Sequence, residues 1–227
     1  MEMTASTPQR DIAGPRILAR GPWRSDQIVS RWVEEAFEPS ALQSALADQA
    51  IARLRAQGSP SHDGLAGRLR DHHASARGLE LDLQPMRWSL RLIRGDAARA
   101  IAALCVTRAA DGRWLAGRRA GWVASWPGRW TLGAGGSVDL GENPAHTLTR
   151  ELREEWHVTP ERLSGEALVE LPQRLVMLIG LAWLPAGAER EVQPDAEHDH
   201  FAWWPAEIDR WPQEADQSVR RMAQMLA

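Results

Sequence analysis

The sequence contains no lysine, no tyrosine and a single cysteine, Cys105. One cysteine excludes an intrachain disulfide and a cysteine-built zinc site. Because Cys105 lies in the apolar run IAALCV, we interpret it as a buried structural thiol. No apolar run approaches the roughly 18 residues of a membrane span, and the first residues lack the apolar segment of a secretory signal. A cytoplasmic location is therefore the default expectation.

The charge is nearly balanced, with 27 basic residues, 30 acidic residues and a net charge of −3. This balance does not favour non-specific binding to nucleic acid. The chain has 227 residues, 44% hydrophobic and 25% charged, as is ordinary for a globular protein. Such a length fits one large domain, or one domain with a substantial appendage.

Residues 1–22 are polar and contain three prolines, so we expect a loose arm there. The apolar spacing predicts a helix over residues 28–37, with Ser25 as its cap, and a second helix over residues 41–56 that ends before Gly58. The alternating stretches GLAGRLRDHH and GLELDLQPMRWSLRLI then predict strands.

The pattern changes near residue 100. AIAALCVTRA is typical of a central strand, AADG of a hairpin turn and RWLAGRR of the return strand. Two more strands are predicted in EALVELPQRLVMLIGLAWLPAG, another in HFAWWP, and a helix from about residue 215 to residue 226. We therefore predict an α+β fold with a main domain over residues 96–227. Residues 1–95 would form an N-terminal extension of two helices and short strands.

One predicted helix carries an unusual amount of negative charge. Asn143 is a suitable N-cap, and Pro144 would occupy the first helical position. Three glutamates follow at i, i+3 and i+4 on one helical face: Glu151, Glu154 and Glu155. Like charges at this spacing repel, so either water screens them or a cation neutralises them. Three carboxylates within one turn suit Mg²⁺, with Mn²⁺ as the alternative.

Two further residues belong with this cluster. Glu142, at the end of the preceding loop, can reach the same region, and Arg150 can join two of the carboxylates through its guanidinium fork. The segment ELREE alone would be read as a solvated helical face, because most glutamate-rich turns are of that kind. The spacing of the surrounding residues changes that interpretation.

The stretch resembles the Nudix box, G-x5-E-x7-R-E-U-x-E-E-x-G-U, where U is a bulky aliphatic residue. Six fixed positions match, and they are Gly136, Glu142, Arg150, Glu151, Glu154 and Glu155. Leu152 and Val158 match the aliphatic positions. A chance match in a chain of this length is on the order of one in a million.

The resemblance implies a Nudix-type mixed β-sheet sandwiched between helices, and Mg²⁺-dependent hydrolysis of a nucleoside diphosphate linked to another group. It implies that Glu151, Glu154 and Glu155 bind the metal and that Gly136 offers a carbonyl or sets the loop. By the same resemblance, Arg150 orients the carboxylates and Glu142 supports them. The implied partner is a nucleoside-diphosphate-linked small molecule, without a membrane or nucleic acid, and a homodimer is left open.

The sequence departs from the box at His157, where the family usually has glycine. That position ends the helix and favours a left-handed conformation. Histidine tolerates this conformation less well than glycine, at a loss of about 1 kcal/mol. The departure therefore concerns the loop rather than the metal ligands.

The base that accepts the proton of the attacking water is open among Glu154, Glu197 and Asp199. The candidates for phosphate binding are Arg118 and Arg119 at a predicted strand end and Arg129 before the metal loop. Each of these arginines could equally form a surface ion pair.

The layout of residues 45–130 resembles the UDP-sugar-hydrolysing Nudix proteins, so a nucleotide sugar such as UDP-glucose is the favoured substrate. Pro172 lies near a proline of ADP-ribose-cleaving relatives. ADP-ribose, NADH or a nucleoside triphosphate are therefore alternatives. A nucleotide sensor that binds without cleavage is an alternative of another class. An isoprenoid-diphosphate isomerase would require Cys105 as a catalytic residue.

Overall fold

A computed structural model describes residues 14–227. The strands are β1 Arg16–Arg24, β2 Ile28–Trp32, β3 Leu65–Ser75, β4 Gly78–Arg87, β5 Ile101–Arg108, β6 Trp114–Arg119, β7 Trp130–Leu132, β8 Ala134–Ser137, β9 Arg162–Glu170, β10 Val176–Trp183 and β11 His198–Trp204. The α-helices are α1 Ala41–Ala56, α2 Pro144–Trp156 and α3 Gln217–Leu226. Short 3₁₀ helices are η1 Ser25–Gln27, η2 Trp88–Leu92, η3 Ala188–Arg190 and η4 Ile208–Arg210. Within residues 14–227, no helix is long and apolar enough to cross a membrane.

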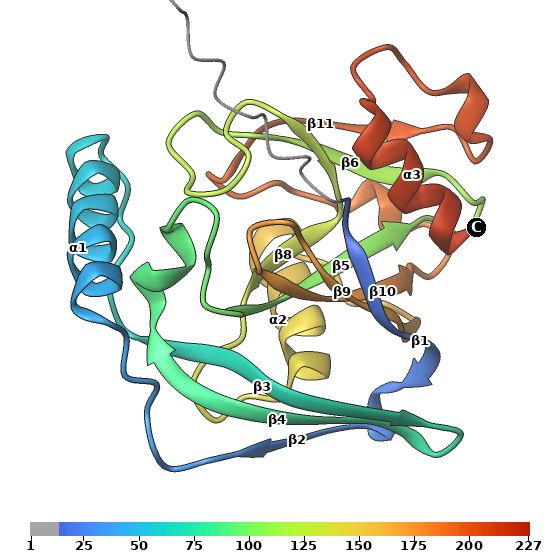
Figure 1. The fold of residues 1–227 in the computed structure, drawn as a ribbon. Coiled ribbons are helices and arrows are strands. Elements are labelled where there is room, and N and C mark those ends of the chain that lie inside the picture. Colours follow the sequence, from blue (N-terminus) through green and yellow to red (C-terminus); the bar gives the residue numbers. More distant parts are fainter. Residues whose placement is uncertain (1–13) are drawn as a thin grey trace, which may run out of the picture.

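The strands form two sheets (Figure 1). The larger sheet has eight strands, six of them in the order β1-β9-β10-β5-β6-β11, with β8 paired to β5 and β7 paired to β6. It is mixed, because β10 runs parallel to β5 while β9 and β8 are antiparallel to their neighbours. The smaller sheet has the order β2-β4-β3.

The larger sheet has a hydrophobic core on each face. Along β5, Ile101, Ala103 and Cys105 belong to one core cluster, and the alternate residues belong to the other. The first cluster contains the buried side of α2, and the second contains the buried side of α3. The predicted α+β fold, a mixed sheet between helices, is thereby confirmed. Burial of Cys105 raises the pKa of its thiol to about 12, in keeping with a structural role.

The smaller sheet packs on the same side as α2. Leucines of β3 and β4 share the core cluster of that helix, namely Leu69, Leu79, Leu81 and Leu83. Trp32 at the end of β2 donates a 3.0 Å hydrogen bond from Nε1 to the Glu142 carbonyl. The N-terminal region therefore supports the loop that leads into α2.

The helix predicted over residues 28–37 is wrong. Ile28–Trp32 is β2, parallel to β4, with Ile28 buried and Val29 exposed. Apolar residues four positions apart fit a strand as well as a helix, so the spacing was ambiguous over so short a segment. Pairing with the free edge of β4 stabilises the segment as a strand. The helix over residues 41–56 and the strands after it are confirmed, except that residues 88–92 form η2.

The loose arm predicted for residues 1–22 is wrong from Arg16 onward, and residues 1–13 lie outside the described part of the chain. Arg16–Arg24 forms β1, which pairs with β9 at the edge of the larger sheet. The register shifts between Arg20 and Trp23, on either side of Pro22. A proline is tolerated at an edge strand or a bulge, because no ladder hydrogen bond is lost there.

Candidate active site

Helix α2 is set by local sequence at both ends. The Asn143 side chain accepts a 2.9 Å hydrogen bond from the Ala145 backbone N–H and donates a 2.8 Å bond to the Ile28 carbonyl. Pro144 begins the helix, as predicted. His157 ends it in the left-handed conformation, at φ 58°, which confirms the expectation for that position. The buried face includes Leu148, Leu152 and Trp156, and Arg150 donates a hydrogen bond to Glu142 in the preceding loop.

The glycine-rich strand β8 lies directly against two glutamates of α2. The Gly135 backbone N–H donates a 3.0 Å hydrogen bond to Glu155 Oε1. A Cβ placed on Gly136 would lie 2.1 Å from Glu151 Oε1, so a larger residue there would displace the Glu151 carboxylate from this position. Glu151 and Glu155 are both buried. The fold therefore holds two carboxylates in the interior, close to the backbone of β8.

The buried carboxylates are not fully neutralised. Burial raises the pKa of Glu151 to about 7, opposed by Arg150 and reinforced by Glu154. Burial also raises the pKa of Glu155 well above its ordinary value, opposed by Arg119 and reinforced by Glu151. Ionised carboxylates in such surroundings need a cation, since an uncompensated buried charge is unfavourable.

Arg150 connects the loop with the helix. Its Nη1 lies 2.8 Å from Glu151 Oε1 and 2.9 Å from Glu154 Oε2, and its Nε lies 3.0 Å from Glu142 Oε1. Glu142 also accepts a 2.8 Å bond from Thr147 Oγ1 and a 3.2 Å bond from the Asp139 backbone N–H. Because these bonds use both of its oxygens, Glu142 is placed as a support for Arg150.

Glu154 differs from the other two glutamates of the box. Its side chain is 57% exposed, against 11% for Glu151 and 5% for Glu155. Among residues 14–227, no group of three or more His, Cys, Asp or Glu side chains is already arranged to hold a metal ion. The carboxylate oxygens of Glu151 and Glu155 and the backbone of Gly136 nevertheless suit a hard divalent cation. Because its side chain is exposed, Glu154 can reach the same cation by a change of side-chain rotamer.

A second charged group lies beside Glu155. Arg119 Nη1 is 3.4 Å from Glu155 Oε2, and Arg119 Nη2 is 2.8 Å from Glu197 Oε2. His198 pairs with Arg119 across β11 and β6, and its ring packs on Trp156 with 4.4 Å between centroids. Arg119 thus links Glu155 of α2 to Glu197 in the segment before β11. Glu197 follows Glu155 by some forty residues in the chain.

The model of the NUDIX domain family matches residues 98–224, more than half of the chain. The chain belongs to the Nudix family. It is therefore a hydrolase that acts on pyrophosphate bonds, in a family that acts on nucleoside-diphosphate-linked substrates and generally uses divalent metal ions.

Solved structures of other Nudix proteins are similar in fold. A MutT NUDIX hydrolase from Burkholderia pseudomallei is 24% identical over 56% of this chain and 98% of that chain, with a TM-score of 0.47. A MutT protein from Methanosarcina mazei is 21% identical over 55% of this chain and 93% of that chain, with a TM-score of 0.42. No curated protein matches the chain.

The remaining predicted residues of this Nudix site are not brought together. Arg118 pairs with Asp199 at 2.7 Å on the surface, and Arg129 pairs with Asp216 at the start of α3. Asp216 is the N-cap of α3, so Arg129 joins that helix to the loop before β7. Of the three arginines proposed for phosphate binding, only Arg119 contacts a glutamate of the Nudix box.

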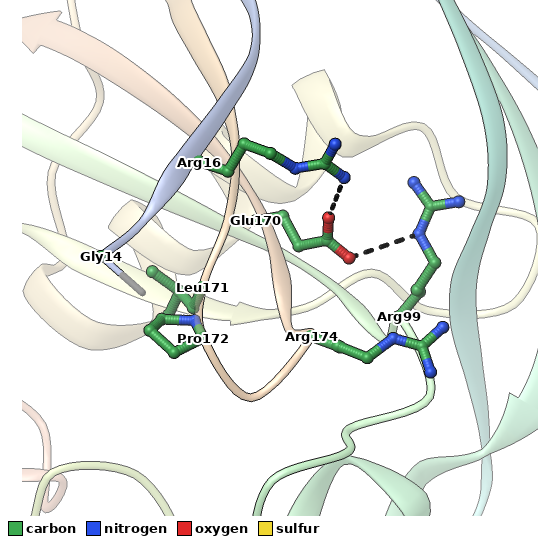
Figure 2. A pocket seen from close by; sticks show the side chains of 7 residues that line it. All are labelled: Gly14, Arg16, Arg99, Glu170, Leu171, Pro172 and Arg174. Atoms are coloured by element: carbon green, nitrogen blue, oxygen red, sulfur yellow. Dashed lines mark hydrogen bonds and ion pairs between the residues drawn. The ribbon is translucent and has the colours of Figure 1, made fainter. Parts of the chain in front are cut away.

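A cavity of about 500 Å³ contains none of the predicted site residues. Arg16 and Arg99 lie on either side of the Glu170 carboxylate in it, and Arg174 and Pro172 line the same space (Figure 2). Because Arg16 belongs to β1 and Glu170 to β9, this ion pair fastens the edge strand to the sheet. Pro172 therefore lies in the turn between β9 and β10 and not against α2.

One charged residue at the Nudix site had no sequence signal. Arg91 in η2 donates hydrogen bonds to Ser137 Oγ in β8 and, at 3.4 Å, to Ser125 Oγ in the loop before β7. Its segment, RWSLRLI, alternates like a strand and lies about sixty residues before the box glutamates. Only the packing of η2 against β8 brings it to the site.

Proposed function

We propose that this chain is a Mg²⁺-dependent hydrolase that cleaves the diphosphate of a nucleoside diphosphate linked to another group, with a nucleotide sugar such as UDP-glucose as the favoured substrate. The observation that carries the proposal is the buried pair Glu151 and Glu155 beside the Gly135–Gly136 backbone. Two incompletely neutralised carboxylates on a Nudix box helix form a cation site that a purely structural helix would not need.

The proposed metal ligands are Glu151, Glu155 and Glu154, with the Gly136 backbone close to them. When bound, Mg²⁺ neutralises the diphosphate and lowers the pKa of a water molecule. Arg150 orients Glu151 and Glu154 through its Nη1 atom, and Glu142 fixes the guanidinium of Arg150. Mn²⁺ would suit the same oxygen ligands.

For the base we propose Glu197. Its side chain is 38% exposed, which leaves it open to water, and its charge acts on both Glu151 and Glu155. Asp199 is less suitable, because its partner Arg118 contacts no glutamate of the box, whereas Arg119, the partner of Glu197, also contacts Glu155. In the proposed step the Glu197 carboxylate accepts the proton of the attacking water. A new P–O bond forms on one phosphorus while the bridging P–O bond breaks, and a monophosphate leaves.

The preference for nucleotide sugars rests on the resemblance of residues 45–130 to UDP-sugar-hydrolysing Nudix proteins. One contact of this region with the box is the 2.9 Å hydrogen bond from the Trp88 indole N–H to Ser137 Oγ, which is compatible with a role in the site. ADP-ribose, NADH and nucleoside triphosphates are the alternatives to be compared directly.

The test is a substrate panel with product identification. Purified protein with Mg²⁺ is incubated with UDP-sugars, ADP-ribose, NADH and nucleoside triphosphates, and the monophosphate product is identified. Release of UMP from a UDP-sugar, faster than any release from the other compounds, is expected. No turnover of any compound by folded protein would contradict the hydrolase. Tight binding without turnover would instead identify a nucleotide sensor.

The base has a matched pair of variants. Glu197→Gln should lower kcat by about 100-fold or more, as removal of a general base does. Asp199→Asn, two residues away and in a surface ion pair, should leave kcat within about twofold, because exposed pairs contribute little. An equal loss in both variants would argue against Glu197 as the base.

A further inference from the structure

Arg91 is held at the edge of the site by contacts made before any ligand binds. It belongs to η2, whose Ser89 and Leu90 are fully buried. The Trp88 backbone N–H donates a 2.8 Å bond to the Gly64 carbonyl, and the Ser89 backbone N–H donates a 3.0 Å bond to Asp63 Oδ1. These anchors fix the backbone of η2, so the guanidinium of Arg91 projects from a rigid element.

The Arg91 side chain contacts the end of β8 directly. It donates to Ser137 Oγ, and the Trp88 indole N–H donates to the same oxygen at 2.9 Å. Ser137 directly follows Gly136, and its carbonyl accepts a 3.1 Å bond from Arg150 Nη2. Arg91 and Arg150 therefore contact the same residue of β8, Arg91 at its hydroxyl and Arg150 at its carbonyl.

Arg91 differs from the other arginines around the box because no carboxylate faces it at contact distance. Within residues 14–227 it makes no ion pair, and its hydrogen bonds go to two serine hydroxyls. Arg119 and Arg150 each pair with glutamates. Burial lowers the pKa of Arg91 to about 10, which leaves it charged at neutral pH.

The partly buried guanidinium of Arg91 has two serine hydroxyls and the Trp88 ring, 5.5 Å from Cζ to the centroid, as its partners. An anion that pairs with it would compensate its charge. The charges that act on Arg91 are those of Glu151, Arg119 and Glu197, all of them groups of the candidate site. A diphosphate at that site would supply oxygens for the planar fork of an arginine.

We infer that Arg91, from the N-terminal region, binds the phosphate oxygens of the substrate. The inference rests on the proposed function, since it takes the diphosphate to lie at the box glutamates. It gives residues 1–95 a direct part in substrate binding, in addition to supporting the loop. Arg91 would then be a substrate-binding residue supplied from outside residues 98–224, the part that matches the NUDIX domain.

The test compares Arg91→Met with Arg94→Met, an exposed arginine just after the same 3₁₀ helix. Titration calorimetry with inorganic pyrophosphate and MgCl₂ measures anion binding without turnover. Arg91→Met should bind pyrophosphate about 10- to 100-fold more weakly, and Arg94→Met should bind it like the unaltered protein. In turnover assays KM should rise for Arg91→Met, and Arg91→Lys should recover only part of the loss, because lysine lacks the fork.

A structural role predicts a different result. If Arg91 only joins Ser137 to Ser125, its loss should lower Tm well below that of Arg94→Met without selectively weakening pyrophosphate binding. If it is an anion-binding group, Arg91→Met should melt at the same temperature or higher, because an unpaired charge has been removed. Should Arg91→Met be insoluble, Arg91→Lys carries the same comparison.

Failure of the inference differs from failure of the proposed function. Turnover by the unaltered protein, with equal pyrophosphate affinity in the Arg91→Met and Arg94→Met variants, would overturn the role of Arg91 alone. Absence of turnover across the substrate panel would overturn the hydrolase, while the pyrophosphate titration would still report on Arg91.

Discussion

Glu142 and Glu151 contact the same guanidinium, that of Arg150, and yet lie in opposite electrostatic environments. Burial alone would raise the pKa of Glu142, but hydrogen bonds from Arg150 and Thr147 outweigh burial and hold it below its ordinary value. Glu151 has one contact with Arg150 and two nearby carboxylates, so burial prevails and its pKa rises to about 7.

The difference separates structure from function within a single motif. On the loop side, both carboxylate oxygens of Glu142 accept hydrogen bonds, so this group needs no ligand. On the sheet side, burial raises the pKa of Glu151 and Glu155, so a cation bound there, as proposed, would stabilise their ionised forms.

Glu155→Gln should remove most of the turnover, by about 100-fold or more, because it takes away a proposed metal ligand that cannot be replaced from the buried side. The fold should be retained or stabilised, since a buried charge is removed. Steady-state kinetics at saturating Mg²⁺ and a melting curve measure both effects. Glu161→Gln, at an exposed position, is the control. Full activity of Glu155→Gln would place the cation elsewhere.

The stability of the metal-free protein should depend on the protonation of Glu151. Its pKa is about 7 in the fold and 4.5 ordinarily, so the folded state holds the proton more tightly. The free energy of unfolding should therefore fall as pH rises from about 4.5 to about 7, by on the order of 3 kcal/mol. Melting curves of the parent protein and Glu151→Gln across this range isolate the effect. Parallel curves for the two proteins would refute it.

Glu142→Gln should affect stability more than chemistry. The variant loses the charged partner of Arg150 and one acceptor of the Thr147 hydroxyl, at a cost of about 1–3 kcal/mol. Denaturant unfolding measures the loss, and kcat should fall far less than in Glu155→Gln. A loss of turnover as large as that of Glu155→Gln, in stable protein, would mean that both sides of Arg150 take part in catalysis.

His157→Gly should have the smallest effect. Glycine relieves the left-handed conformation by about 1 kcal/mol, but the variant loses the 3.0 Å contact between His157 Nδ1 and the Gln193 carbonyl. The net change in Tm should stay within about 4 °C, and turnover should be unchanged. A large fall in kcat would give the imidazole a role in the reaction.

Several parts of the fold could be read from local sequence because local geometry fixes them. The capped helix α2, the hairpin between β5 and β6 and the helix over residues 41–56 depend on periodicity and on caps. The segment over residues 28–37 could not be assigned in this way. Its spacing fits two structures, and only a partner strand more than forty residues away selects one of them.

By itself, the sequence determined that three glutamates and an arginine lie on one helix and that a glycine-rich segment leads into it, since helical spacing is a property of the backbone. Only the tertiary structure decided that Glu151 and Glu155 are buried while Glu154 is exposed. It also decided that Arg119 contacts Glu155 of the box and Glu197, while Arg118 and Asp199 pair on the surface. The contact of Arg91 with Ser137 of β8 likewise depends on the tertiary structure. Burial and ion pairing arise from segments far apart in the chain, and no local pattern encodes which of them will pack together.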